Sequence, residues 1–387
     1  MKSIFRWVTR IVFVVIVLAV AAGIWKRNDI KRLMAVNSLF SEEHILTNFS
    51  HMDAMFFSTP LDVPDASASK LPTEPRAMPN GLDKWVTDRS VTAVVVLKDG
   101  SIAHESYYQD TSPEDLRISW SVAKSFLSAL MGIVVEEGDI ASIDDPVTKY
   151  APNLVGTAYD GASIRNVLNM ASGVSFNEDY LDFNSDINKM GRVLAMGGSM
   201  DKFTASLEGR DRAAGEAWQY VSIDTHVIGM VIRGATGRNI SELMVENLLT
   251  PLGLEADAHY LTDGNGVAFV LGGLNLRTRD YARLGQMFLQ GGMYNGKQIV
   301  PADWVAQSTL PTAPTATGAV QYGYQWWMPA DAADGEYFAR GVYGQYIYID
   351  SASQVVIAAN SVDRLFKEPG SYEQNLAMFR EIAAELR

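Results

Sequence analysis

A serine followed three residues later by a lysine is the pattern in this chain with the clearest chemical use. The spacing occurs three times, beginning at Ser67, Ser121 and Ser199. On a helix, residues i and i+3 share a face, so the amine of Lys124 can reach the hydroxyl of Ser121. Ser67 lies in a Pro/Ser/Ala-rich stretch where nothing would bury its lysine, and Ser199 is expected to cap an exposed helix. Ser121 is therefore the candidate nucleophile.

The segment 121–137 should form the element that positions this pair. It is apolar nearly all round and is followed by Gly138, which predicts a buried helix with a glycine stop. A buried Lys124 would lose its proton near neutral pH and act as a base toward serine. The first-turn N–H groups would favour an oxyanion at Ser121. On spacing alone, a structural interpretation remains open, with Ser121 as an N-cap and Lys124 as a snorkelling residue.

Two further segments place polar groups at the ends of predicted elements. Residues 218–222 precede an apolar helix at 223–237, so Ser222 is expected to cap that helix and Tyr220 to project from the loop before it. A tyrosine near a lysine can share its proton and act as acid or base. The glycines of residues 340–345 would let a backbone N–H face a ligand and complete an oxyanion hole. A core tyrosine and a strand bulge are the alternative interpretations.

The elements around these segments predict an α/β (α+β) fold. Residues 91–109 read as two strands around an Asp-Gly turn, and residues 337–360 read as at least two more. The segment from about 145 to 310 is mostly helical, and residues 371–387 form an amphipathic helix. We therefore expect one antiparallel sheet, built from both ends of the chain and flanked by helices, with a mostly helical inserted domain.

The N-terminus reads as a separate segment. Ile11–Trp25 is a 15-residue stretch without charge and has basic residues on both sides, which predicts a membrane anchor. A cleaved signal peptide with an A-x-A-like site at residues 19–21 and a cytosolic amphipathic segment are the alternatives. The expected organisation is an anchor or signal peptide at 1–27, an extension that wraps the domain at 28–90, and one globular domain at 91–387.

Composition excludes several classes of protein. With 387 residues, 48% of them apolar, the chain can bury a large core. The net charge of −13 makes nucleic acid an unexpected partner. The chain has no cysteine, and its five histidines lack the spacing of a metal site, so no metal or other cofactor is expected. No G-x-S-x-G motif is present, which excludes the nucleophile elbow of an α/β-hydrolase.

Taken together, the three segments resemble a known family. An S-x-x-K pair at the start of a buried helix, a Tyr-x-Ser motif about a hundred residues later and a glycine-rich strand near the C-terminus are typical of the serine β-lactamase, or penicillin-recognising, superfamily. The chain is most similar to its class C-like members, in the 6-aminohexanoate-dimer hydrolase and esterase branch. The resemblance runs from about residue 80 to the C-terminus, with supporting segments at 120–150, 164–180, 272–285 and 343–360.

The resemblance implies a β-lactamase-like fold, an acyl-enzyme mechanism and roles for individual residues. Ser121 resembles the acylated nucleophile, Lys124 its base, and Tyr220 the residue that relays the proton to the leaving group. The backbone amides of Ser121 and Val342 resemble the oxyanion hole. The remaining expected contacts with the substrate are made by Tyr180, Ser222, Gly341 and Tyr343.

Two departures from the family pattern guide the choice of substrate. Ser222 stands where many members carry asparagine, and Ala339-Arg340-Gly341 replaces the Lys-Thr-Gly strand that holds a substrate carboxylate. We therefore expect a hydrolase of a small carboxylic ester or linear amide, anchored in a bacterial inner membrane with its catalytic domain in the periplasm. The alternatives are a β-lactamase or D-Ala-D-Ala peptidase-type enzyme, and a catalytically silent binding protein on the same fold.

Overall fold

The computed structural model describes residues 2–64 and 67–387. Its main feature is a seven-stranded antiparallel sheet. In spatial order its strands are β3 (Ser101–Tyr107), β2 (Val91–Lys98), β13 (Val355–Ser361), β12 (Gln345–Asp350), β11 (Glu336–Gly341), β10 (Trp326–Met328) and β9 (Gln321–Gly323). Because β2 pairs with β13, strands from both ends of the domain meet in one sheet, as the sequence predicts.

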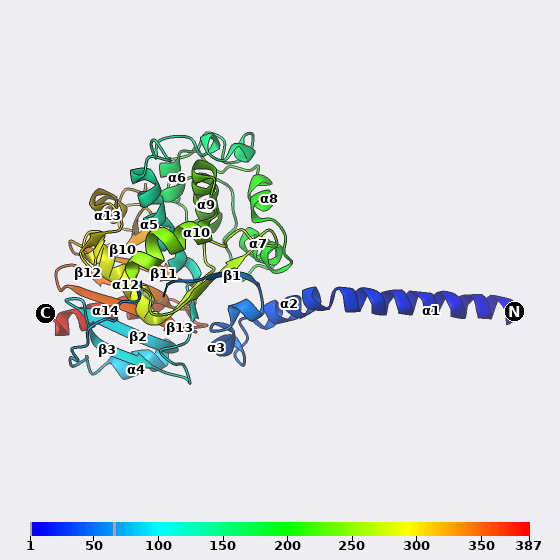
Figure 1. The fold of residues 1–387 in the computed structure, drawn as a ribbon, viewed down its shortest axis with the longest axis horizontal. Coiled ribbons are helices and arrows are strands. Elements are labelled where there is room, and N and C mark those ends of the chain that lie inside the picture. The colour runs from blue at the N-terminus through cyan, green and yellow to red at the C-terminus, as the bar shows by residue number, and fades with distance from the viewer. Residues whose placement is uncertain (1, 65–66) are drawn as a thin grey trace.

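Helices cover both faces of this sheet (Figure 1). They are α4 (Leu82–Asp88) and α14 (Ser371–Glu385) on one face and α12 (Thr278–Leu289) on the other. The ring of Trp85 meets that of Phe379 edge to face beneath the first face. On the second face α12 lies very close to the strands, since a Cβ added at Gly285 would stand 2.5 Å from the Val356 side chain. The sheet is thus buried on both sides.

The rest of the domain is mostly helical and stands beside the sheet (Figure 1). Its helices are α5 (Ala123–Glu136), α6 (Ile164–Leu168), α7 (Asp186–Ala195), α8 (Met200–Ala205), α9 (Ser222–Thr236), α10 (Ile240–Met244), α11 (Thr250–Leu252) and α13 (Ala302–Ser308). A four-stranded sheet, β1 (Phe57–Leu61), β5 (Ala258–Thr262), β6 (Leu274–Leu276) and β4 (Arg117–Ile118), and the hairpin β7 (Met293–Tyr294) and β8 (Lys297–Gln298) complete it. The segment 145–310 therefore contains strands as well as helices, and its helix α12 belongs to the layer on the main sheet.

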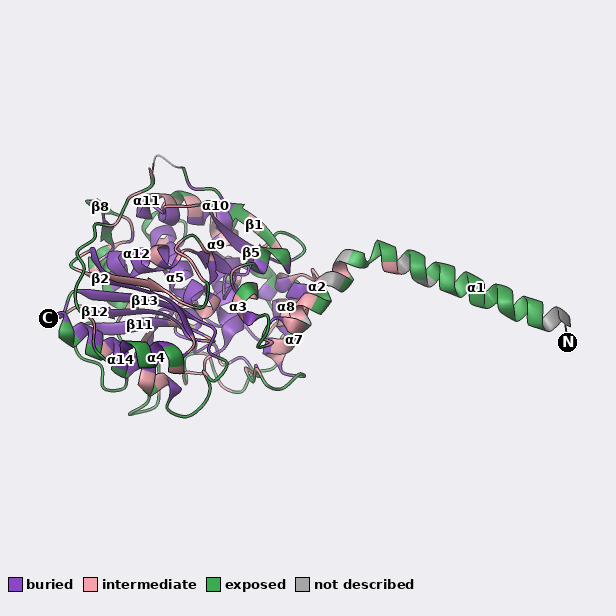
Figure 2. Ribbon diagram, turned by 90° about the horizontal axis from the view of Figure 1, so that it is seen from below, coloured by how far each residue is buried: buried purple, intermediate pink, exposed green. Residues whose placement is uncertain are grey.

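The N-terminal segment is a long helix followed by a short one. Helix α1 (Lys2–Trp25) projects away from the domain, and nearly all of its residues whose burial is described are exposed (Figure 2). Within residues 2–64 and 67–387 it is the one helix long and apolar enough to cross a membrane, over the 21 residues Phe5–Trp25; a signal sequence passes the same test. Helix α2 (Arg27–Ser38) returns the chain to the domain, and α3 (Ile45–Asn48) leads into β1.

Candidate active site

Ser121 lies in a 3₁₀ turn, Trp120–Val122, immediately before α5. The sequence places Ser121 as the first residue of the long helix, but regular α-helix begins two residues later, at Ala123. Trp120 has φ of +41°, a conformation that bulky residues adopt only under constraint from their surroundings. Its ring is held between Phe40 and Phe49, at centroid distances of 5.7 and 5.6 Å. Ser121, in this turn, is half-buried and lines a cavity.

Lys124 lies on the first turn of α5 and is buried, with 1% of its surface exposed. Its amine donates to the Leu271 carbonyl over 3.0 Å and lies 5.5 Å from the centroid of the Tyr220 ring. Burial lowers the pKa of Lys124 to about 7, although the carboxylates of Glu178 and Asp224 oppose that change. The amine is therefore about half deprotonated at neutral pH and can accept a proton.

The other two serine–lysine pairs have different surroundings. The hydroxyl of Ser67 donates to the Pro64 carbonyl, and Ser199 accepts from the backbone of Lys202 as the N-cap of α8. The lysines of both pairs are exposed. Within the described residues, the pair Ser121 and Lys124 is the one of the three in which the serine lines a cavity and the lysine is buried.

Tyr220 projects from the loop before α9, where the sequence predicts it. Its ring stacks on Trp327 at a centroid distance of 5.2 Å. Burial raises the pKa of Tyr220, and the charge of Glu178 raises it further, while the Ser121 and Ser222 hydroxyls oppose this. The phenol therefore keeps its proton at neutral pH and is able to donate it.

Glu178 is a member of this cluster that sequence reasoning did not single out. Its carboxylate accepts from the backbone N–H of Ser222 at 3.0 Å, from the Ser222 hydroxyl and from the Tyr180 hydroxyl at 2.9 Å. Ser222 is consequently not the N-cap predicted from the sequence: it is the first residue of α9, and a glutamate distant in sequence caps the helix end. Glu178 thus ties Tyr180 to Ser222 beside Tyr220.

Asp224, in the first turn of α9, is the second carboxylate near the lysine. It is fully buried and accepts from the hydroxyls of Tyr159 at 2.7 Å and Ser172 at 2.8 Å. Burial raises the pKa of Asp224 to about 7, in spite of these hydrogen bonds. Lys124 therefore has two acidic neighbours, Glu178 and Asp224, which favour its charged form and oppose the lowering of its pKa by burial.

The turn between β11 and β12 packs against the backbone of Ser119 and Ser121. A Cβ at Gly341 would stand 2.7 Å from the Ser119 carbonyl oxygen and 3.1 Å from the Ser121 nitrogen, so only glycine permits this approach. Val342 follows and lines the same cavity as Ser121. The Arg340 guanidinium lies over the Tyr372 ring at 5.2 Å, on the α14 side of the sheet, and its charge is still near enough to Tyr220 to oppose the rise in the pKa of that phenol.

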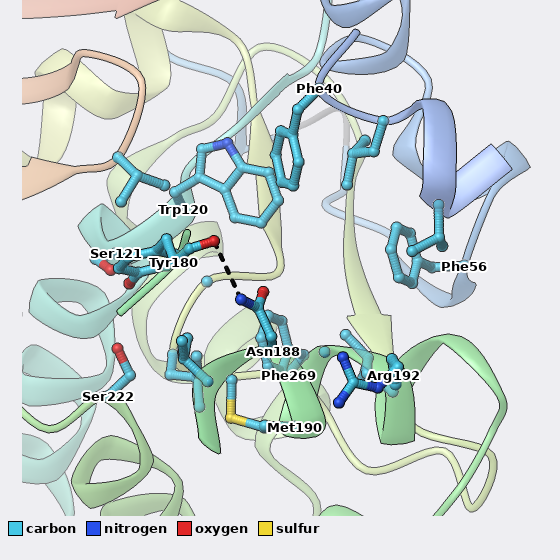
Figure 3. Close-up of a pocket in the computed structure, with 18 of the residues that line it drawn as sticks. Phe40, Phe56, Trp120, Ser121, Tyr180, Asn188, Met190, Arg192, Ser222 and Phe269 are labelled. Carbon is cyan, nitrogen blue, oxygen red and sulfur yellow. Dashed lines mark hydrogen bonds between the residues drawn. The ribbon is translucent and has the colours of Figure 1, made fainter. Parts of the chain in front are cut away.

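A cavity of about 670 Å³ opens beside Ser121 (Figure 3). Five of the residues that the sequence singled out line it: Ser121, Tyr180, Ser222, Val342 and Tyr343. The other three, Lys124, Tyr220 and Gly341, lie outside its lining. Asn188 of α7 also lines it and donates to the Tyr180 carbonyl over 3.1 Å, which fixes the loop that carries Tyr180 and Glu178.

The fold and this cluster define the class of protein. The Beta-lactamase family profile matches residues 82–371, and the chain belongs to that family. The resemblance drawn from the sequence is therefore confirmed at the level of the family.

Individual relatives narrow the comparison. The chain is 31% identical over 310 residues to the 6-aminohexanoate-dimer hydrolase of Paenarthrobacter ureafaciens, covering 76% of each chain. Among solved structures it resembles a Bacillus anthracis protein assigned as a 6-aminohexanoate-dimer hydrolase, with a TM-score of 0.81 and 22% identity over 90% of this chain and 96% of that one. A Bacteroides dorei protein assigned as a beta-lactamase gives a TM-score of 0.63 and 21% identity over 78% and 97%. These two structural matches bear out the expected fold.

Proposed function

We propose that this chain is a membrane-anchored serine hydrolase that cleaves a carboxylic ester or a linear amide through an acyl-enzyme on Ser121. The observation that carries the proposal is Ser121 at the wall of an apolar cavity, next to a fully buried Lys124 whose pKa is lowered to about 7. A base with a pKa near the working pH is best suited to deprotonate a serine hydroxyl. The 31% identity to a 6-aminohexanoate-dimer hydrolase supports amide hydrolysis.

In the proposed reaction the neutral amine of Lys124 takes the proton of Ser121 as its oxygen attacks the carbonyl carbon. The oxyanion that forms accepts hydrogen bonds from the backbone N–H groups of Ser121 and Val342, which Gly341 allows to approach. Tyr220 passes a proton to the leaving group, and the acyl-enzyme is then hydrolysed by water activated through the same pair. Atoms balance as one water consumed for each ester or amide bond broken.

The substrate is held by the residues that line the cavity. Near Ser121 the cavity wall is polar and aromatic and consists of Tyr180, Ser222 and Tyr343. The hydroxyls of Tyr180 and Ser222 both donate hydrogen bonds to Glu178. The Arg340 guanidinium lies over the Tyr372 ring, and that of Arg192, which lines the cavity, lies over the Phe183 ring at 4.2 Å and donates to the Phe183 carbonyl. Both cations near the site therefore already have partners within the chain. This arrangement favours esters and linear amides over penicillin-type substrates.

The proposed location is a bacterial inner membrane, with the catalytic domain in the periplasm. The apolar stretch of α1 is long enough to span a bilayer, and its projection from the domain leaves it free to do so.

Labelling of the serine tests the proposal directly. A fluorophosphonate probe followed by mass spectrometry should modify the peptide that contains Ser121, and Ser121→Ala should lose both labelling and hydrolysis of p-nitrophenyl acetate. Ser67→Ala and Ser199→Ala are matched controls, since their lysines are exposed. Labelling elsewhere, or hydrolysis retained by Ser121→Ala, would refute the mechanism. Turnover of a penicillin instead of esters would favour the β-lactamase alternative, and the absence of any labelling would favour a silent binding protein.

A further inference from the structure

The cavity beside Ser121 is larger and more apolar than a small ester requires. Its volume of about 670 Å³ is in the middle of the range of roughly 300–1,000 Å³ found for small-molecule sites. Beyond the polar groups near Ser121, its walls are mostly aliphatic and aromatic side chains of α2, α7 and the loops before and after them (Figure 3). Asn188 and Arg192 of α7 are polar members of this lining, and the Arg192 guanidinium is held over the Phe183 ring. Leu39, Phe56, Met190 and Leu194 are among these apolar groups. A polar substrate gains little from such walls.

One wall comes from the segment that follows the proposed anchor. Leu33 and Val36 of α2, then Leu39 and Phe40, line the cavity. Leu33 is eight residues after Trp25, a helical rise of about 12 Å from the end of α1. The cavity wall therefore begins at most about 12 Å along the chain from the place where it would leave the hydrocarbon core, just outside a headgroup layer of about 5–8 Å.

The rim of the cavity is also apolar and open to solvent. Leu181 and Phe183 line the cavity with 84% and 71% of their surface exposed, and Leu33 and Phe40 are also exposed. Large exposed apolar side chains gathered at one opening mark a surface that meets another apolar phase. Because part of this rim lies on α2, which directly follows the proposed anchor, the phase that fits it is the membrane.

We propose that the cavity binds the long aliphatic acyl chain of a fatty-acyl ester or amide that enters from the membrane surface. This inference rests on the proposed hydrolase function and names its substrate class. The alkyl chain belongs to the acyl side of the scissile bond because Tyr220, which serves the leaving group in the proposed reaction, lies outside the cavity lining. The reacting bond then lies at Ser121, and the alkyl tail extends between α2 and α7.

Substrate chain length provides the first test. The full-length protein, reconstituted in vesicles of ether-linked phosphatidylcholine, is assayed with p-nitrophenyl acetate, butyrate, octanoate and dodecanoate. Each methylene that leaves water contributes up to about fourfold in binding, so kcat/KM should rise at least tenfold from acetate to dodecanoate. A flat or falling series would overturn the inference. If kcat/KM rose for dodecyl acetate relative to ethyl acetate but did not rise along the acyl series, the cavity would bind the alcohol part of the ester, and this would also overturn the inference.

A variant that fills the cavity provides the second test. Gly191 of α7 lines the cavity, and a Cβ added there meets nothing within 4 Å, so Gly191→Phe projects a ring into open space. It should lower the dodecanoate-to-acetate ratio of kcat/KM at least tenfold. Ala306→Phe, on the exposed side of α13, adds the same ring outside the cavity and should leave the ratio unchanged. An equal ratio in Gly191→Phe and the wild type would refute the acyl-chain site.

A binding measurement separates this inference from the proposed function. Ser121→Ala, which cannot form the acyl-enzyme, should still bind 11-(dansylamino)undecanoic acid, and Gly191→Phe should weaken that binding at least tenfold. Binding that persists in a wild-type protein without esterase activity would support the cavity and refute the hydrolase. Ester hydrolysis that depends on Ser121, with no binding of the probe and no preference for chain length, would refute the cavity and leave the hydrolase intact.

Discussion

Replacing Lys124 with methionine should make the protein more stable while abolishing hydrolysis. The wild-type lysine is fully buried, and its pKa is about 7 instead of its ordinary 10.5. At 1.36 kcal/mol for each pH unit, a charged Lys124 costs the fold about 5 kcal/mol, and at pH 7, where it is half charged, about 4 kcal/mol. Methionine has a similar volume and carries no charge. The variant leaves the Leu271 carbonyl without its hydrogen bond from Lys124, which costs about 1–3 kcal/mol of stability. The variant should therefore be more stable than the wild type by about 1–3 kcal/mol at pH 7.

The pH dependence of this gain is the sharper measurement. Between pH 7 and 10.5 the unfolded lysine binds a proton that the folded one does not, so this group makes wild-type stability rise with pH. The advantage of Lys124→Met should therefore shrink by about 2 kcal/mol from pH 7 to pH 9. Any effect of methionine on packing is the same at pH 7 and pH 9, so it cancels when the two stability differences are compared.

The assay is urea unfolding of the full chain in detergent, followed by tryptophan fluorescence at pH 6, 7, 8 and 9. Lys202→Met is the control, because this lysine follows Ser199 at the same spacing but is exposed, and its effect should stay within about 0.5 kcal/mol at every pH. A Lys124→Met variant less stable than the wild type, or a stability difference that does not change with pH, would refute the argument that Lys124 is a desolvated base.

Three further results are expected. Tyr220→Phe should lower kcat by about 10²–10⁴ with an unchanged circular dichroism spectrum, since the ring still stacks on Trp327; near-normal turnover would assign Tyr220 to packing alone. Glu178→Gln should move the rise of activity with pH, which follows the neutral form of Lys124, toward lower pH, because the carboxylate raises the pKa of that lysine; an unshifted profile would contradict this. The full chain should stay with membranes in high salt, and a chain starting at residue 28 should be soluble and active; release of the full chain by salt would count against an anchor.

Much of the fold follows from local sequence patterns. The Asp-Gly turn joins β2 and β3 as expected, since Asp99 and Gly100 both have positive φ, the conformation that this tight hairpin requires. The apolar run after Ser121 becomes α5, and the last residues become α14. Strands at 57–61 and 258–262 were not predicted, because β1 and β5 are stabilised by pairing with each other across two hundred residues. Long-range pairing leaves little trace in either segment alone.

The candidate site divides in the same way. Ser121 and Lys124 share a helical spacing, and Tyr220 precedes a recognisable helix start, so a sequence pattern can find all three. Glu178 could not be found, because it caps α9 from a loop 44 residues earlier. In the sequence nothing distinguishes it from the other acidic residues of that loop. The cavity could not be predicted from sequence patterns either, since its walls come from segments as distant in the chain as α2 and the β11–β12 turn.

The segment 28–90, expected from its sequence to be only a wrap around the domain, contributes directly to the candidate site. Phe40 stacks on Tyr343 at 4.7 Å and lies 5.7 Å from Trp120, the residue whose unusual backbone precedes Ser121. Loss of α2 and Phe40 would therefore expose two aromatic rings and remove the support of the turn that carries Ser121. Since α2 follows α1 directly, the same piece of chain sets the distance of the domain from the proposed membrane anchor and builds one wall of the cavity. A change in the length of α2 would alter both at once.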